Sequence, residues 1–249
     1  MTEFIDVNAT NLDRYGFFCM RSKPKNAGHQ NKRLWLQARF NDGLKLKIVQ
    51  VDGKQKGFIE YIPGAFTWRA IDAKDYMAIH CFWVVGKNKG KGYGSTLLNL
   101  CIEDALAQGL RGVAIVTSEK GWLPNKQYFE KKGFHMVDQI DAFQLMVLDF
   151  DQRVKVEARL SNWKHTAEKY QEGVTVFTSD QCPFNQDAVD NVQAAGDELG
   201  IDVQIIHLDD YESAQQQSPI PYGTFCVIYN GKIITYHPET KNKYLKLLS

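Results

Sequence analysis

Hydrophobic and polar residues alternate with two different periods along the first 150 residues. Apolar residues at every second position, or in short unbroken runs, predict strands, and apolar residues three or four positions apart predict helices. The predicted strands cover residues 4–7, 45–51, 56–63, 76–85, 112–117, 134–137 and 143–148, and the predicted helices cover residues 34–40, 94–108 and 124–132. The run at 76–85 is apolar throughout, which indicates a central strand buried on both faces.

A second pattern of the same kind begins at residue 174. Its predicted strands cover residues 174–179, 203–208, 224–229 and 232–236, and its helices cover residues 185–199 and 242–248. Residues 151–172, between the two patterns, are charged and only weakly amphipathic. We therefore expect a first domain at 1–150, a linking helix or exposed connector at 151–172, and a second, smaller αβ domain at 173–249.

The composition narrows the classes of function. Of the 249 residues, 44% are hydrophobic and 24% are charged, and the formal net charge is +1. This balance creates no overall field for nucleic acid or an anionic membrane. No stretch approaches the roughly 18 apolar residues of a membrane span, and the first ten residues lack the features of a signal peptide. The five cysteines are scattered, without a CxxC or Cys/His cluster, so we expect a reduced cytoplasmic protein without a metal site.

Three glycines alternate between the central strand and the helix that follows it: Gly90, Gly92 and Gly94. Glycine accepts positive φ and lets an anion approach the backbone closely. The N–H groups at the start of the helix, and the helix dipole, then attract negative charge. Three lysines alternate with the glycines, Lys87, Lys89 and Lys91. A diphosphate is the ligand that this pattern predicts.

Two common nucleotide-binding loops do not fit this segment. A P-loop requires GxxxxGK followed by Ser or Thr, but only three residues separate Gly86 from Gly90, and Lys91 is followed by glycine. A dinucleotide-binding fingerprint requires GxGxxG, and its third glycine falls on Ser95.

Two blocks of the sequence resemble the GNAT acetyltransferase superfamily. The block KNKGKG at 87–92 is similar to the family's Gln/Arg-x-x-Gly-x-Gly/Ala motif, with Lys87 in the first position, and FEKKGF at 129–134 is similar to its YExxGF ending. With its two-part layout, the whole chain resembles the YoaP-like GNAT proteins, which carry a small C-terminal domain. The resemblance implies an α/β (α+β) fold with a mixed, mostly antiparallel central sheet, and acetyl-CoA as cosubstrate.

The same resemblance implies a set of cosubstrate-binding residues. Val84 and Val85 would pair with the pantetheine arm through their backbone, and amides between residues 89 and 96 would hold the pyrophosphate. The implied set is Val84, Val85, Lys87, Lys89, Gly90, Lys91, Gly92, Tyr93, Gly94, Ser95, Thr96, Asn125 and Phe129.

The acid and the base of the transfer are less clearly indicated. The tyrosine that commonly protonates the leaving thiolate in this superfamily falls on Phe129, which has no proton to give, so its neighbour Tyr128 is the candidate acid. His80 lies in the apolar strand and has a suitable unperturbed pKa for a base, although a buried core histidine is the alternative.

The second domain contains a cysteine between a predicted strand and a predicted helix, in the sequence QCPFN at 181–185. A thiolate is stabilised at a helix N-terminus, so Cys182 is a further candidate for chemistry. The order of elements resembles the thioredoxin fold, with Asn185 in place of a resolving cysteine and Gly223 where the cis-proline is expected. Two roles are therefore open for the second domain: a redox or thiol-exchange role, and a structural or substrate-presenting role.

Together these features predict an acetyl-CoA-dependent N-acetyltransferase that acts by direct transfer in a ternary complex. The acceptor would be a small-molecule or peptide amine that the sequence does not identify, and the sequence leaves the oligomeric state open. The alternatives are a thiol-redox or thiol-binding protein centred on Cys182 and a CoA-binding module without turnover.

Overall fold

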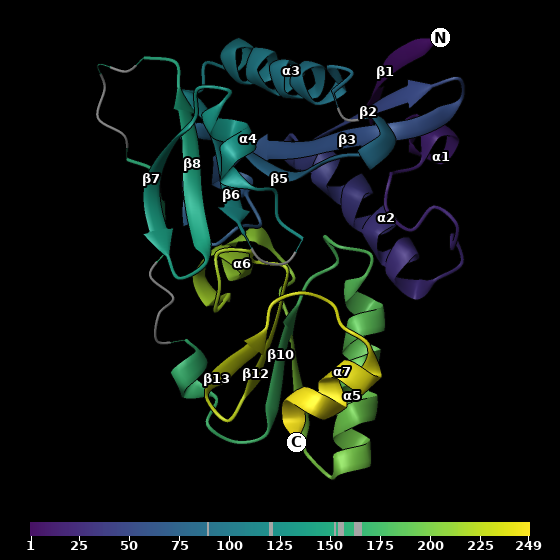
Figure 1. Ribbon diagram of the computed structural model, residues 1–249, viewed down its shortest axis with the longest axis vertical. Helices are drawn as coiled ribbons and strands as arrows, with labels where there is room; N and C mark the ends of the chain where they lie inside the picture. Colours follow the sequence, from purple (N-terminus) through teal and green to yellow (C-terminus); the bar gives the residue numbers. More distant parts are fainter. Residues whose placement is uncertain (89, 120–121, 152, 154–156, 162–165) are drawn as a thin grey trace. The chain divides into compact units, whose positions relative to one another are not determined.

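The computed structural model describes residues 1–88, 90–119, 122–151, 153, 157–161 and 166–249 (Figure 1). These residues form two compact units. The first consists of Met1–Arg21, Leu36–Thr67 and Ile71–Leu160, and the second of Ser22–Trp35, Trp68–Ala70 and Ser161–Ser249.

A seven-stranded sheet forms the first unit, in the order β1-β2-β3-β5-β6-β8-β7. The strands are β1 (Thr2–Val7), β2 (Lys45–Val51), β3 (Lys54–Pro63), β5 (Tyr76–Val84), β6 (Gly112–Ser118), β7 (His135–Ile140) and β8 (Phe143–Asp149). Only β5 and β6 are parallel among the neighbours of this described sheet. The predicted mixed, mostly antiparallel central sheet is therefore confirmed.

The helices of the first unit are α1 (Leu12–Tyr15), α3 (Tyr93–Ala107) and α4 (Lys126–Glu130). Helix α3 packs Leu97, Leu98 and Cys101 into a core with β-strand residues such as Ile59 and Met77. The apolar spacing that predicted a helix at 94–108 is therefore the spacing of its buried face. A two-residue strand, β4 (Ile71–Asp72), pairs with β9 (Arg159–Leu160), and the sequence pattern did not predict this pair.

Strands β5 and β6 pair along only part of their length. Their parallel register runs from Tyr76 opposite Gly112 to Ile79 opposite Ile115, while β5 itself continues to Val84. On its other edge β5 pairs with β3 as far as Val84, opposite Gly57. The outer part of β5 thus has one paired edge and one edge open to a ligand.

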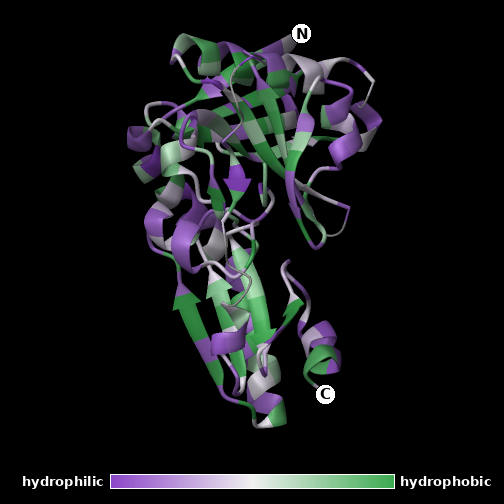
Figure 2. Cartoon of the chain, turned by 90° about the vertical axis from the view of Figure 1, so that its left-hand side faces the viewer, coloured by the Kyte–Doolittle hydropathy of each residue, from purple (hydrophilic) through white to green (hydrophobic). Residues whose placement is uncertain are grey.

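A four-stranded sheet forms the second unit, in the order β11-β10-β12-β13. Strand β10 (Val174–Thr178) is parallel to β11 (Val203–His207) and antiparallel to β12 (Phe225–Tyr229), which pairs antiparallel with β13 (Lys232–Thr235). The helices are α5 (Asn185–Leu199), α6 (Tyr211–Gln217) and α7 (Lys241–Leu248), and a 3-10 turn, η4 (Ala167–Lys169), precedes the sheet. Strands of both units are predominantly hydrophobic, whereas the helices mix hydrophobic and hydrophilic residues (Figure 2).

Two short segments from the first half of the sequence also belong to the second unit. Gly28 lies against the backbone of Pro183, Asn26 donates a hydrogen bond from Nδ2 to Asp187 Oδ1 at 2.8 Å, and the N–H of Ala70 donates to the carbonyl of Pro221 at 3.2 Å. The sequence analysis placed both segments in the domain at 1–150. The apolar pattern could not show otherwise, because it gives no sign of contacts with residues so distant in the sequence.

Helix α2 (Ala27–Arg39) begins seven residues before the helix expected at 34–40. Its buried positions include 28, 32, 35 and 36, which are spaced as one face of a helix. Glycine and lysine occupy the first two of these positions, so an apolar pattern alone could not show that the helix starts there. No helix in the described part of the chain is long and apolar enough to cross a membrane.

Candidate functional site

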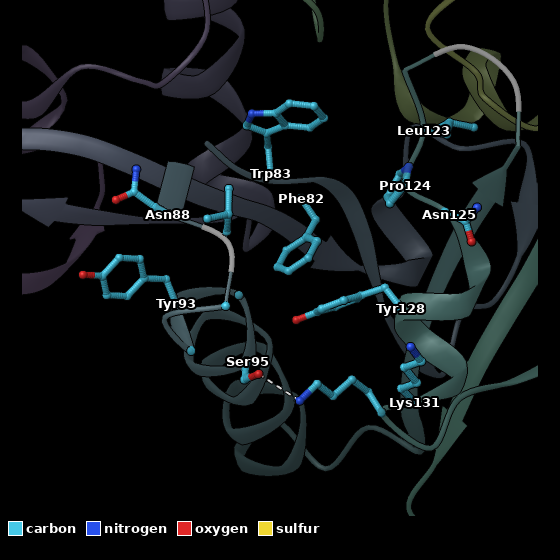
Figure 3. Close-up of a pocket in the computed structure, with 15 residues that line it drawn as sticks. Phe82, Trp83, Asn88, Tyr93, Ser95, Leu123, Pro124, Asn125, Tyr128 and Lys131 are labelled. Carbon is cyan, nitrogen blue, oxygen red and sulfur yellow. Dashed lines mark hydrogen bonds between the residues drawn. The ribbon is translucent and has the colours of Figure 1, made fainter. Parts of the chain in front are cut away.

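A cavity of about 650 Å³ opens beside the unpaired edge of β5 (Figure 3). Its volume lies within the range of small-molecule and cofactor sites. Three parts of the first unit line it: the end of β5, the glycine turn with the start of α3, and helix α4 with the loop before it. The predicted site residues on its wall are Val84, Gly90, Gly92, Tyr93, Gly94, Ser95, Asn125 and Tyr128.

The first two glycines of the turn are needed for the conformation of the backbone. Gly90 and Gly92 both have a φ of +82°, in the left-handed region, and a β-carbon on either would meet open space. Gly92 is also the N-cap of α3 and provides no side chain to cap its N–H groups. The glycines therefore expose the backbone at the start of α3 to the cavity.

Gly94 has a different role, because here a side chain would collide with its neighbours. A β-carbon on Gly94 would lie 2.9 Å from Tyr128 Oη and 3.2 Å from Phe82 Cζ. The absence of a side chain lets α4 and β5 approach the first turn of α3 closely.

The first turn of α3 presents backbone donors that have no acceptor within the helix. The first intrahelical bond runs from the N–H of Thr96 to the carbonyl of Gly92, at 3.0 Å. The N–H groups of residues 93–95 precede it and have no acceptor within the helix. No acidic residue lies in this turn to compete for them, so the helix end favours an anionic ligand.

Helix α4 turns Tyr128 toward the cavity and Phe129 into the core. Phe129 is completely buried among aromatic rings, whereas the Tyr128 ring lies 5.3 Å from the ring of Phe82 on the cavity wall (Figure 3). The Tyr128 hydroxyl oxygen is itself buried and lies beside the Ser95 side chain. Burial raises the pKa of Tyr128, and the nearby Ser95 side chain partly offsets this rise.

Two lysines that the sequence analysis did not single out also line the cavity. Lys131 and Lys132 follow α4, and Lys132 Nζ donates a hydrogen bond to Ser95 Oγ at 2.8 Å (Figure 3). Both lysines belong to the family-like block at 129–134, but only the fold shows that this block faces the glycine turn. The aromatic wall of Phe82 and Trp83 was also not predicted, because a central strand was expected to be buried on both faces.

Comparisons with known proteins agree with this geometry. A model of the acetyltransferase (GNAT) family matches residues 15–134, and a YoaP-like family model matches residues 203–246. The "Uncharacterized N-acetyltransferase YoaP" of Bacillus subtilis (strain 168) is 31% identical over 250 residues, which cover 99% of this chain and 98% of that protein. The chain belongs to the GNAT acetyltransferase family. It is therefore an acyltransferase of the YoaP-like type.

Solved GNAT structures resemble about three fifths of the chain. A GNAT acetyltransferase from Staphylococcus aureus is 16% identical, with a TM-score of 0.45, and covers 61% of this chain and 100% of its own. The PaiA N-acetyltransferase from Thermoplasma acidophilum, in complex with coenzyme A, is 13% identical, with a TM-score of 0.43, and covers 60% and 99%.

Some residues that the resemblance implied do not line the cavity of this GNAT protein. Val85 donates its N–H to the carbonyl of Lys56 at 2.9 Å, and its own carbonyl accepts a bond from the N–H of Asn88 at 2.8 Å. Lys87, Lys91, Thr96 and the buried Phe129 are likewise absent from the described lining. Lys89 lies outside the described residues. Asn125 is on the wall and caps α4, because its side chain accepts a bond from the N–H of Gln127 at 2.8 Å.

His80, the candidate base, is buried in the sheet of the acetyltransferase unit. Its Nε2 lies 3.2 Å from Thr67 Oγ1, and its Nδ1 lies 3.5 Å from Glu60 Oε1. Glu60 on β3 is 2% exposed, so a carboxylate and an imidazole share an interior position. His80 is not part of the described cavity lining. The sequence analysis missed Glu60 and Thr67, because both are distant from His80 in the sequence and meet it only in the fold.

Cys182 lies in the second unit, in the turn before α5, and is partly buried. Its carbonyl accepts a bond from the N–H of Asn185 at 3.1 Å. Asn185 is 2% exposed, and its Nδ2 donates to the carbonyls of Ser179 and Thr224 at 2.9 and 2.8 Å. Gly223 has a φ of +74°, and there is no cis peptide bond among the described residues. No cluster of three or more metal-ligating side chains occurs in the described ranges.

Proposed function

We propose that this acyltransferase uses acetyl-CoA and transfers the acetyl group directly to an amine acceptor in a ternary complex. The observation that supports this best is the cavity between the open edge of β5 and the start of α3. Its glycine turn and helix N-terminus suit a diphosphate, and its apolar wall of Phe82, Trp83 and Val84 suits the pantetheine arm. One site thus offers the two chemical surfaces that a CoA thioester requires.

Direct transfer also fits the geometry of the strand. The outer part of β5 has backbone groups on the edge that β6 leaves unpaired, and an N–H on that edge can donate to the oxygen of a thioester. The acceptor must be neutral to attack, and for a lysine-like amine this costs about 4–5 kcal/mol at pH 7.

Isothermal titration calorimetry of the full chain with acetyl-CoA tests the proposal. The wild-type chain should bind, and Gly92→Val should weaken binding at least about tenfold, because a β-branched residue at a φ of +82° costs about 1–3 kcal/mol or distorts the turn. Gly109→Val is the matched control: Gly109 follows the other end of α3, has a φ of +68° and also faces open space. It should retain wild-type affinity.

Three outcomes separate the alternatives. A wild-type chain that does not bind acetyl-CoA contradicts the cosubstrate assignment, and an equal loss in both valine variants contradicts the assignment of the turn. If binding is observed, release of free CoA thiol across a panel of amines distinguishes the transferase from a CoA-binding module without turnover.

For the second unit we propose a thioredoxin-like domain in which Asn185 serves structure instead of redox chemistry. The order β11-β10-β12-β13, with β10 and β11 parallel, supports the first part. The second part rests on Asn185, which occupies the place of a resolving cysteine and joins the turn after β10 to the carbonyl of Thr224.

Chemical denaturation of two variants tests this structural role. Asn185→Ala should lower the free energy of unfolding by about 1–3 kcal/mol, because it removes two buried hydrogen bonds. Cys182→Ser is close in size and should change stability by less than about 1 kcal/mol. The assignment is wrong if Asn185→Ala leaves the free energy of unfolding unchanged. It is also wrong if the pH dependence of Cys182 alkylation gives a thiol pKa well below 8.5 and the protein catalyses disulfide exchange.

A further inference from the structure

Helices α3 and α4 direct several hydrogen-bond donors at the same part of the cavity. From α3 come the N–H groups of residues 93–95, which have no acceptor within the helix. From α4 comes the Tyr128 hydroxyl, which abuts Gly94, and from the turn after α4 comes the Lys132 ammonium, which contacts Ser95 Oγ at 2.8 Å. Ser95 Oγ accepts from Lys132 and lies beside the Tyr128 hydroxyl, so the three side chains gather at one place.

A ligand that satisfies this part of the cavity must accept hydrogen bonds and carry negative charge. An amine or a neutral donor would face a helix N-terminus and an ammonium, neither of which accepts a hydrogen bond. The oxygens of a phosphate accept several hydrogen bonds at once and match the positive charge of Lys132 and the helix end. Among the parts of a CoA thioester, only its phosphate groups meet both conditions.

We propose that Tyr128, Ser95 and Lys132 form a side-chain clamp on the phosphate groups of the acyl donor, and that Tyr128 binds the donor instead of protonating the departing thiolate. The proposal rests on the proposed use of acetyl-CoA. In this proposal the side chains of α4 and the turn after it bind the same phosphate groups as the glycine turn, from the opposite wall of the cavity.

The position of Tyr128 argues against the role of acid. Its hydroxyl lies against the first turn of α3, where the phosphates are expected, and the full pantetheine arm separates the phosphates from the sulfur of CoA. Burial also raises the pKa of Tyr128. A general acid works best when its pKa lies near the working pH, so this shift makes Tyr128 a poorer acid near pH 7. The same shift keeps the hydroxyl protonated, as a donor to phosphate must be.

Binding measurements with donors that carry or lack phosphates test the clamp. Acetyl-CoA, inorganic pyrophosphate and the phosphate-free S-acetylpantetheine are titrated against the full chain and against Tyr128→Phe and Lys132→Met. Each variant should bind acetyl-CoA and pyrophosphate about ten- to a hundredfold more weakly, the range expected for one hydrogen bond to a charged group. Their affinity for S-acetylpantetheine should equal that of the wild type. Lys126→Met, on α4 but outside the cavity lining, should change none of the three affinities.

The outcomes distinguish this proposal from the one on which it rests. A wild-type chain that binds no acetyl-CoA overturns the proposed function and the clamp with it. If the wild type binds acetyl-CoA and both variants bind it equally well, only the clamp is wrong. Equal losses of acetyl-CoA and S-acetylpantetheine would also overturn it, because they would indicate a general disturbance of the cavity, and unchanged thermal unfolding excludes a loss of fold.

Discussion

Single residues decide which side chains line the cavity. Gly94 lets Tyr128 and Phe82 approach the first turn of α3, and a methyl group at this position would displace one of them. Phe129, one residue beyond Tyr128, is buried in the core instead. Neighbouring residues on a helix point about 100° apart, so a shift of one position between Tyr and Phe changes which ring reaches the cavity.

At the same scale, His207 is expected to make stability depend on pH. A hydrogen bond that His207 donates to Asp180, and more weakly one that it donates to Asp209, raises the pKa of His207 to about 9, against an opposing effect of burial. A raised pKa in the folded state means that the stabilisation is fully present below the unfolded value near 6.5 and is lost as pH rises through about 9. Because the side chain is 40% exposed, the effect should be modest.

Thermal unfolding of the wild type and His207→Gln between pH 6 and pH 10 measures this effect. The wild type should have the higher midpoint at pH 6, and the difference should disappear as pH approaches 10. A difference that grows between pH 7 and pH 10 would show that the charged imidazole does not stabilise the fold.

At the scale of elements, packing of α2 against the turn before α5 overrides local preference. Gly28 lies in the first turn of α2, where the sequence pattern expects no helix. A β-carbon at this position would lie 2.1 Å from the carbonyl oxygen of Pro183, which is backbone and cannot rotate away. Glycine has a low helix propensity, yet it is required at position 28 for α2 to pack against Pro183.

The variant Gly28→Ala sets these two effects against each other. Helix propensity alone predicts a gain of about 0.8–1 kcal/mol, whereas the collision predicts a net loss of stability of about 1–3 kcal/mol. Hydrogen–deuterium exchange should then become faster in residues 22–35 and in the turn before α5. Gly86→Ala is the control, since a β-carbon there meets open space, and it should leave exchange in these segments unchanged. A stabilised Gly28→Ala variant would contradict the packing.

At the scale of the whole molecule, the chain joins an acetyltransferase unit to a second αβ unit. The relative from Bacillus subtilis matches across 98% of its own length, so it carries both parts in the same order. The second unit is built from three separate stretches of the chain, two of them within the first 70 residues. Removing residues 68–70 would leave the carbonyl of Pro221 without the N–H of Ala70, and removing residues 22–35 would leave Asp187 without the Asn26 side chain.

The sequence by itself determined the features that depend on neighbouring residues. Periodic apolar positions located α3 and α5, and alternating glycines located the turn with positive φ before α3, because backbone preference and side-chain period are local properties. From these, and from the resemblance of two blocks, the family and several residues of the cavity wall could be predicted.

Only the tertiary structure decided which distant residues meet. It brought Tyr128 and Lys132 to the first turn of α3, paired Glu60 with His80 inside the sheet, and added residues 22–35 to the second unit. None of these contacts leaves a periodic signal, because polar residues and glycine carry them and because strand order and helix packing are set by burial over the whole fold. The glycine turn could therefore be predicted from the sequence, whereas the side chains that face it across the cavity could not.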